Sequence, residues 1–153
     1  MSDSTITAKE PENLVELATF YVSDALCGID ILKVQEINKV MQMTKVPQAP
    51  AYVLGILNLR GQIVTIIDLG KKLGLGKTST HSSPRNIIVN SSGSHVGLLV
   101  ESISDVVTAD MNKVEPPPAN MNGIQGKYFT GVCKTDKLLI GILDVEKVLA
   151  LED

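Results

Sequence analysis

The sequence has no tryptophan, and aromatic residues make up only 3% of its 153 residues. Large rings therefore cannot fill much of a core, and Val, Ile and Leu must supply most of the packing within a hydrophobic fraction of 44%. This composition favours β-structure over a helical bundle, because branched aliphatic side chains pack well on pleated strands. The length fits one compact domain or two small modules that share a core.

Positive charge is not in excess either. The 14 Lys and Arg residues are outnumbered by 17 Asp and Glu residues, which gives a formal net charge of −3 and a pI near 5.4. A nucleic-acid partner needs cationic groups to neutralise its phosphates, so we expect no nucleic-acid binding. No segment reaches the roughly 18 continuous apolar residues of a membrane span, so we expect no direct membrane insertion.

Residues suited to metal binding or nucleophilic catalysis are scarce. Cys27 and Cys133 stand far apart, outside any CxxC pair and away from the histidines. His81 and His95 have no acidic or cysteine partner at ligand spacing, and no serine lies in a GxSxG motif. The sequence therefore predicts two reduced structural thiols, no metal, no cofactor and no enzymatic activity.

Two polar stretches divide the chain. Residues 1–13 predict a disordered tail, and the run KTSTHSSP at residues 77–84 separates two halves of similar length. We expect a folded region over residues 14–151, composed of one subdomain at about 14–82 and a second at about 83–151.

The two halves resemble each other. A shift of 69 residues aligns Gly28 with Gly97, and a shift of 76 places residues 55–73 on residues 131–149 without gaps. Each copy predicts a hairpin and strand followed by a short helix, an order that is hard to obtain twice by chance. We infer a duplicated, all-β structure of small SH3-like barrels, since a parallel sheet would need long crossover helices. The matched positions are Val34/Ile103, Glu36/Asp105, Ile37/Val106, Gly55/Gly131, Ile66/Ile142, Asp68/Asp144, Lys71/Lys147 and Leu73/Leu149.

Asp68 and Asp144 each follow an apolar strand and precede a short helical stretch. As helix N-caps they would accept a hydrogen bond from an otherwise unpaired backbone N–H. Two rival functions stay open: a small hydrolase with an acidic site at one of these residues, and an OB-like binder of single-stranded nucleic acid. The binder would need positive charge and stacking rings, and the chain offers only Phe20, Tyr21, Tyr52, Tyr128 and Phe129.

Four segments carry a resemblance to a known family: GIDILKVQEI (28–37), GILNLRGQIVTIIDL (55–69), VGLLVESISDVV (96–107) and YFTGV (128–132). Together they resemble the CheW-like coupling proteins of bacterial chemotaxis. The resemblance covers residues 17–151 in the family's order, which favours a stand-alone coupler over a larger relative such as CheV. It implies two five-stranded SH3-like barrels with a common core and a non-catalytic adaptor.

The resemblance also implies partners. Family couplers bind the regulatory domain of the histidine kinase CheA and the cytoplasmic tip of methyl-accepting chemotaxis receptors. We therefore expect a cytoplasmic protein at receptor arrays beneath the inner membrane, monomeric when isolated. A scaffold of a non-flagellar chemosensory system is the alternative.

Site residues follow by position from the resemblance. A charged pair, Glu36 and Arg60, is expected to orient a partner-facing loop, with Arg60 at a hairpin tip where Gly61 supplies a positive φ. In the groove, Gly97 would let a receptor helix approach the backbone, although buried strands carry the same apolar residues and a strand glycine can be purely structural. The kinase-facing surface falls on Ile31, Val34 and Ile37, and the receptor groove falls on Ile88, Gly97, Ile103 and Val106.

Overall fold

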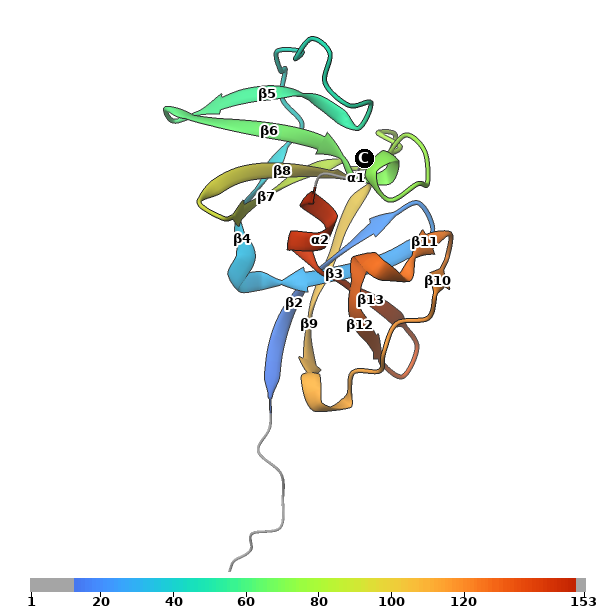
Figure 1. The fold of residues 1–153 in the computed structure, drawn as a ribbon. Coiled ribbons are helices and arrows are strands. Elements are labelled where there is room, and N and C mark those ends of the chain that lie inside the picture. The colour runs from blue at the N-terminus through green and yellow to red at the C-terminus, as the bar shows by residue number, and fades with distance from the viewer. Residues whose placement is uncertain (1–12, 151–153) are drawn as a thin grey trace, which may run out of the picture.

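The computed structural model describes residues 13–150, and this part of the chain consists mainly of β-strands with a few short helices (Figure 1). The predicted tail, residues 1–13, lies outside the described residues except for Asn13. Among the helices described, none has the length and apolar character needed to cross a membrane.

The elements follow one another in an order that repeats. In each half two strands lead to a third strand, and a hairpin and a short α-helix come later; a 3-10 helix precedes the third strand in the first half and follows it in the second. In chain order they are β2 (Leu14–Val22), β3 (Ala25–Asp30), η1 (Ile31–Lys33), β4 (Val34–Lys39), β5 (Val53–Leu59), β6 (Gln62–Asp68), α1 (Leu69–Lys72), β7 (Arg85–Ser91), β8 (Ser94–Val100), β9 (Ser102–Asp110), η2 (Met111–Lys113), β10 (Asn120–Met121), β11 (Ile124–Gln125), η3 (Gly126–Tyr128), β12 (Phe129–Lys134), β13 (Leu139–Leu143) and α2 (Val145–Leu149).

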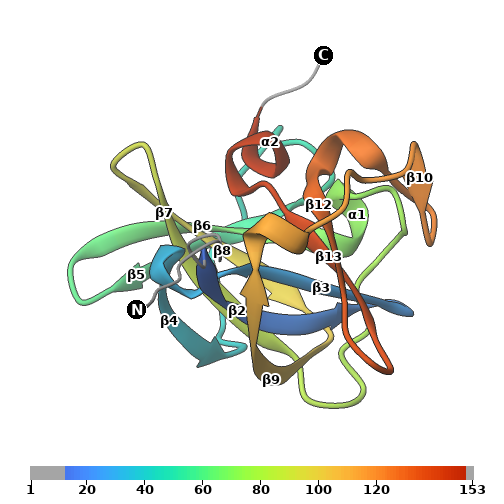
Figure 2. The ribbon, with the colours of Figure 1, turned by 90° about the horizontal axis from the view of Figure 1, so that it is seen from below.

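Apart from β10 and β11, which pair with each other, the described strands form two five-stranded sheets, which confirms the predicted fold class. Sheet A has the order β12-β13-β3-β2-β9, and sheet B has the order β4-β7-β8-β6-β5. Most neighbours are antiparallel, and β2 runs beside β9 along its length (Figure 2). One pair in each sheet is parallel: β13 with β3, and β6 with β8.

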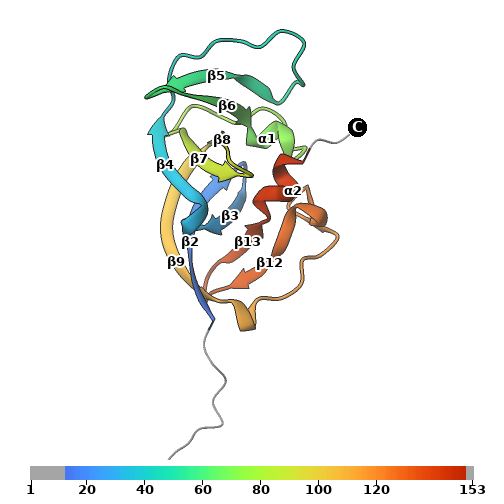
Figure 3. The ribbon, with the colours of Figure 1, turned by 60° about the vertical axis from the view of Figure 1, so that its left-hand side comes forward.

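Each sheet draws strands from both halves of the chain. In sheet A, β2 and β3 from the first half join β9, β12 and β13 from the second. In sheet B, β4 leaves the β2–β3 region through η1 and lies against β7 (Figure 3). The expected boundary near residue 82 therefore does not divide one sheet from the other, because the chain passes from sheet A to sheet B at η1 and returns between β8 and β9.

The hydrogen-bond register confirms the duplication. Ile66 pairs with Gly97 in sheet B, and the matched residues Ile142 and Gly28 pair in sheet A. The β5–β6 hairpin shifts register between Val53 and Gly55, and the β12–β13 hairpin does so at the matched residues 129 and 131. Both sheets were therefore built from the same pattern.

The largest core cluster joins the two sheets into one body. It takes Phe20 and Ile29 from sheet A, Ile87 and Val89 from sheet B, and further side chains from both α-helices. Two smaller clusters complete the interior, one around Leu17 and Ile140 and the other around Ile66 and Ile88. Burial of this kind stabilises by roughly 1.5 to 3 kcal/mol per large aliphatic side chain, so separating the sheets would be costly.

Candidate docking surfaces

Strand β4 and the preceding η1 carry the residues expected to face the kinase. Ile31 and Val34 are half-buried against the main core, whereas Ile37 is 40% exposed. A register shift between Val34 and Glu36 lets Val34 pair with Val89 and Ile37 pair with Ile87. Directly paired side chains share a face of the sheet, so Val34 and Ile37 lie on one face of this edge strand. We call Val34 and Ile37 the β4 patch.

Strand β9 repeats this arrangement in sheet A. Ile103 pairs with Phe20 and Val106 pairs with Ala18 across a register shift, so both lie on the face that carries the main core. Val106 is 53% exposed and Ile103 is 37% exposed. We call Ile103 and Val106 the β9 patch. In the duplication, the two residues of the β9 patch correspond to the two residues of the β4 patch. Both patches lie on an edge strand of a five-stranded sheet.

The other two residues expected in the receptor groove lie elsewhere. Ile88 is 2% exposed within the cluster around Ile66, and Gly97 is also buried. A Cβ added at residue 97 would clash with Cδ1 of Ile66 and lie 3.0 Å from Cδ1 of Ile88. The space on the Cβ side of Gly97 is therefore filled by side chains of its own sheet, and a receptor contact at Gly97 stays a prediction.

Glu36 joins a small polar network beside the β4 patch. Its Oε2 accepts a hydrogen bond from Nη2 of Arg60, and its Oε1 accepts one from Nδ2 of Asn38 at 2.8 Å. The hydrogen bond from Asn38 and then that from Arg60 lower the pKa of the Glu36 carboxyl below its ordinary value. The pair thus ties β4 to the β5–β6 hairpin.

The turn between β5 and β6 presents Arg60 to solvent. Arg60 and Gly61 both have positive φ, 51° and 88°, as a tight two-residue hairpin loop requires. Oδ1 of Asn58 accepts a hydrogen bond from the Gly61 N–H at 2.9 Å and holds the loop closed. Ile63 follows in β6 and is 60% exposed.

Sequence reasoning missed a third apolar surface. Leu32 in η1 is 89% exposed, because the Asp30 side chain caps this short helix through the Leu32 N–H at 2.9 Å and turns the leucine outward. Leu14 is 53% exposed and lines the same shallow pocket of about 200 Å³. The available signal was Asp30 two residues before Leu32, a spacing typical of a helix cap.

Asp68 and Asp144 occupy the N-cap positions of α1 and α2. Asp68 Oδ1 accepts a hydrogen bond from the Lys71 N–H at 3.1 Å, and Asp144 Oδ1 accepts one from the Lys147 N–H at 3.2 Å. Asp68 is buried, and its carboxylate also accepts hydrogen bonds from the hydroxyl and backbone N–H of Thr78. The two carboxylates therefore act locally, each at its own helix.

The thiols and acidic groups form no cluster for chemistry within residues 13–150. No group of three or more His, Cys, Asp or Glu side chains there could hold a metal ion. Cys27 is buried, and burial raises the pKa of its thiol to about 12. Burial likewise raises the pKa of Cys133. Both thiols are free and protonated at neutral pH.

Comparison with known proteins identifies the family. The CheW-like domain family matches residues 16–153. The chain belongs to this family. This CheW-like chain is 34% identical to "Chemotaxis protein CheW" of Treponema pallidum over 142 residues, which cover 90% of this chain and 84% of that protein. A protein of the same name from Klebsiella aerogenes is 33% identical, with coverage of 90% and 83%.

A solved structure agrees with the sequence relatives. The crystal structure of the scaffolding protein TtCheW from Thermoanaerobacter tengcongensis has a TM-score of 0.82 and 34% identity to this CheW-like chain. The match covers 97% of this chain and 95% of that one. The resemblance stated from four sequence segments is therefore confirmed, and the chain is a CheW-like chemotaxis scaffold.

Proposed function

We propose that this CheW-like chain couples the histidine kinase CheA to methyl-accepting chemotaxis receptors and is itself non-catalytic. In this proposal it works in the cytoplasm, at receptor arrays on the inner membrane. The observation that carries the proposal is a pair of matched apolar patches, one on the edge strand of each sheet. The β4 patch serves the kinase and the β9 patch serves the receptor.

The common core makes bivalent binding effective. Because side chains of both sheets pack into one cluster, the two patches keep a fixed relation to each other. A rigid body with two binding surfaces raises the effective concentration of one partner near the other. A change in receptor state can then reach the kinase as altered interface geometry, without turnover of any substrate.

The exposure of the patches suits modest contacts. Ile37 and Val106 are each partly exposed on an edge strand. Small apolar surfaces of this kind are typical of transient interfaces that bury about 1,200 Å² or less, where strength comes from many copies in an array. Ile31, half-buried against the main core, is the third residue of the kinase-facing surface in this proposal.

Glu36 and Arg60 have a positioning role in this proposal. Their ion pair links β4 to the tip of the β5–β6 hairpin, so the hairpin is held beside the kinase-facing patch. The Arg60 side chain is 70% exposed, which limits the pair's effect on folding stability. In this proposal the ion pair acts mainly by fixing the position of the β5–β6 hairpin beside the β4 patch.

Co-sedimentation tests the coupling directly. Membranes that contain a methyl-accepting receptor are pelleted with purified kinase, in the presence and absence of this CheW-like chain. We expect the kinase in the pellet only when the chain is added, and neither protein in the pellet with receptor-free membranes. A chain that stays in the supernatant, or a kinase that pellets equally well without it, would contradict the proposal.

A further inference from the structure

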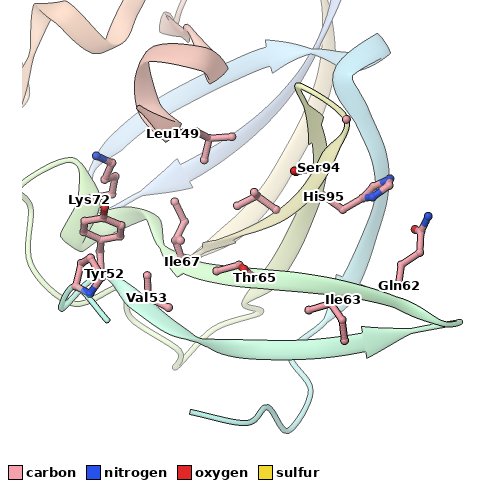
Figure 4. Close-up of a pocket in the computed structure, with 13 residues that line it drawn as sticks. Tyr52, Val53, Gln62, Ile63, Thr65, Ile67, Lys72, Ser94, His95 and Leu149 are labelled. Carbon is pink, nitrogen blue, oxygen red and sulfur yellow. The ribbon is translucent and has the colours of Figure 1, made fainter. Parts of the chain in front are cut away.

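A cleft of about 610 Å³ opens in sheet B between the β5–β6 hairpin, the β7–β8 turn and the end of α2 (Figure 4). Val53, Ile67, Val96 and Leu149 supply apolar side chains to its wall. Its size lies within the range of small-molecule sites, roughly 300 to 1,000 Å³. The cleft is formed by neither the β4 patch nor the β9 patch.

The duplication shows how sheet A fills the matching space. Val53 corresponds to Phe129 and Thr65 corresponds to Gly141 at the shift of 76 residues. The Phe129 ring is buried and lies directly over Gly141, where the end of the Met121 side chain also packs. In sheet B the smaller Val53 stands at the ring's position, and both Val53 and Thr65 line the open cleft. Sheet B therefore leaves room for an apolar group that sheet A supplies from its own chain.

The charge of the cleft indicates what else a ligand would carry. Lys72 lines one end and is 8% exposed; its Nζ donates a hydrogen bond to the Ala150 carbonyl at 3.0 Å and lies 4.8 Å from the centre of the Tyr52 ring. The Ala150 carbonyl and the Tyr52 ring are both uncharged, and within residues 13–150 no carboxylate pairs with the ammonium group of Lys72. His95 lines the cleft as well, whereas no Asp or Glu does among the described residues.

Lys72 is largely buried and has no carboxylate partner within residues 13–150, so an anionic ligand would offset the cost of burying its charge. After the bond to Ala150, two N–H donors of Lys72 remain for it. We propose that the cleft binds a small amphipathic carboxylate, with its apolar body against Val53, Ile67 and Leu149 and its carboxylate at Lys72. This site is independent of the adaptor role.

Calorimetric titration of the full chain with decanoate tests the proposal, with 1-decanol as the neutral comparison and both kept below their aggregation limits. We expect decanoate to bind at least about tenfold more tightly than decanol, a difference of about 1.4 kcal/mol. Lys72→Met should remove this preference while decanol binding is kept, which a merely structural role of Lys72 would not predict.

The double variant Val53→Phe/Thr65→Gly copies the filled arrangement of sheet A. It should lose at least about tenfold in decanoate affinity and keep the wild-type circular dichroism spectrum. Leu139→Phe, an enlargement at an exposed position of β13 outside the cleft and both patches, should bind decanoate like the wild type. Methyl NMR provides a second measurement should the double variant fail to fold: decanoate should shift the Val53, Ile67 and Leu149 signals of the wild-type protein.

Several results would overturn the proposal. They are an absence of decanoate binding by the wild type, equal affinity for decanoate and decanol, undiminished binding by a folded double variant, and methyl NMR shifts confined to Met121 and Val132 beside sheet A. A wild-type protein that binds no decanoate but forms dimers, which the double variant does not form, would assign the cleft to a second copy of the chain instead.

Discussion

Gly97 in β8 lies directly beside the side chain of Ile66 in the parallel strand β6, so closely that a Cβ at residue 97 would collide with the Ile66 Cδ1 atom. The matched glycine of sheet A, Gly28, is less crowded: a Cβ there would lie 3.2 Å from Cγ2 of Ile140. At this matched position, sheet B therefore leaves less room for a side chain than sheet A does.

Gly97→Ala should destabilise the protein by about 1 to 3 kcal/mol through overpacking, and Gly28→Ala should cost less. Urea denaturation of both variants measures the difference. Receptor co-sedimentation of Gly97→Ala should fall only as far as its folded fraction falls. A Gly97→Ala variant with wild-type stability and no receptor binding would instead support a direct receptor contact at Gly97.

Ile37→Glu and Val106→Glu are a matched pair, because each places a carboxylate on an equivalent, exposed position of an edge strand. We expect Ile37→Glu to weaken kinase binding at least about tenfold and to leave receptor binding unchanged. Val106→Glu should do the reverse. Pull-down with each partner separately measures both effects. Loss of both partners in either variant, with the fold intact, would show that the patches are not separate sites.

Asp68→Ala should cost more stability than Asp144→Ala. Loss of a helix cap costs about 1 kcal/mol in either case, and Asp68→Ala also leaves the buried Thr78 hydroxyl and N–H without their acceptor, which adds about 1 to 3 kcal/mol. Thermal and urea unfolding compare the two variants. Equal costs would mean that Thr78 finds another partner.

The lowered pKa of Glu36 predicts a pH dependence of stability. A carboxyl group whose pKa is lower in the folded state stabilises the protein above its unfolded value, here 4.5, and loses that contribution as the pH falls through the folded value. Stability measured from pH 6 to pH 3 should therefore fall more steeply for the wild type than for Glu36→Gln. Added salt should reduce the difference. Parallel pH profiles would show that the Asn38 and Arg60 contacts are not maintained in solution.

Asn86 in β7 is fully buried, and neither polar atom of its side-chain amide has a hydrogen-bond partner among residues 13–150. Asn86→Leu keeps the branching at Cγ and removes two unsatisfied polar atoms, so it should be neutral or stabilising by about 1 to 2 kcal/mol. Asn38→Leu on the paired strand β4 is the contrasting variant, because Asn38 donates a hydrogen bond to Glu36 and should lose stability. A destabilising Asn86→Leu, measured by urea unfolding, would mean that a buried water satisfies the amide.

Local patterns were sufficient for much of the structure. Turn residues such as Gly61 predicted the hairpin turns, and Asp68 and Asp144 predicted the starts of the two helices. The places of Glu36 and Arg60 in the family motifs predicted that these two residues pair. The burial of Ile88 and Gly97 was not predictable in this way. Residues that face a core and residues that face a partner are both apolar, and only the neighbours brought by other strands distinguish them.

The sequence by itself determined that the chain is a duplicated β-protein of the CheW-like family, because turn residues, strand alternation and the two repeat spacings are local or internal properties. Only the tertiary structure decided that the halves exchange strands. Which strands pair depends on contacts between residues far apart in the chain, such as Gly28 with Ile142. Those contacts also fix which apolar residues are enclosed and which, like Leu32, remain at the surface.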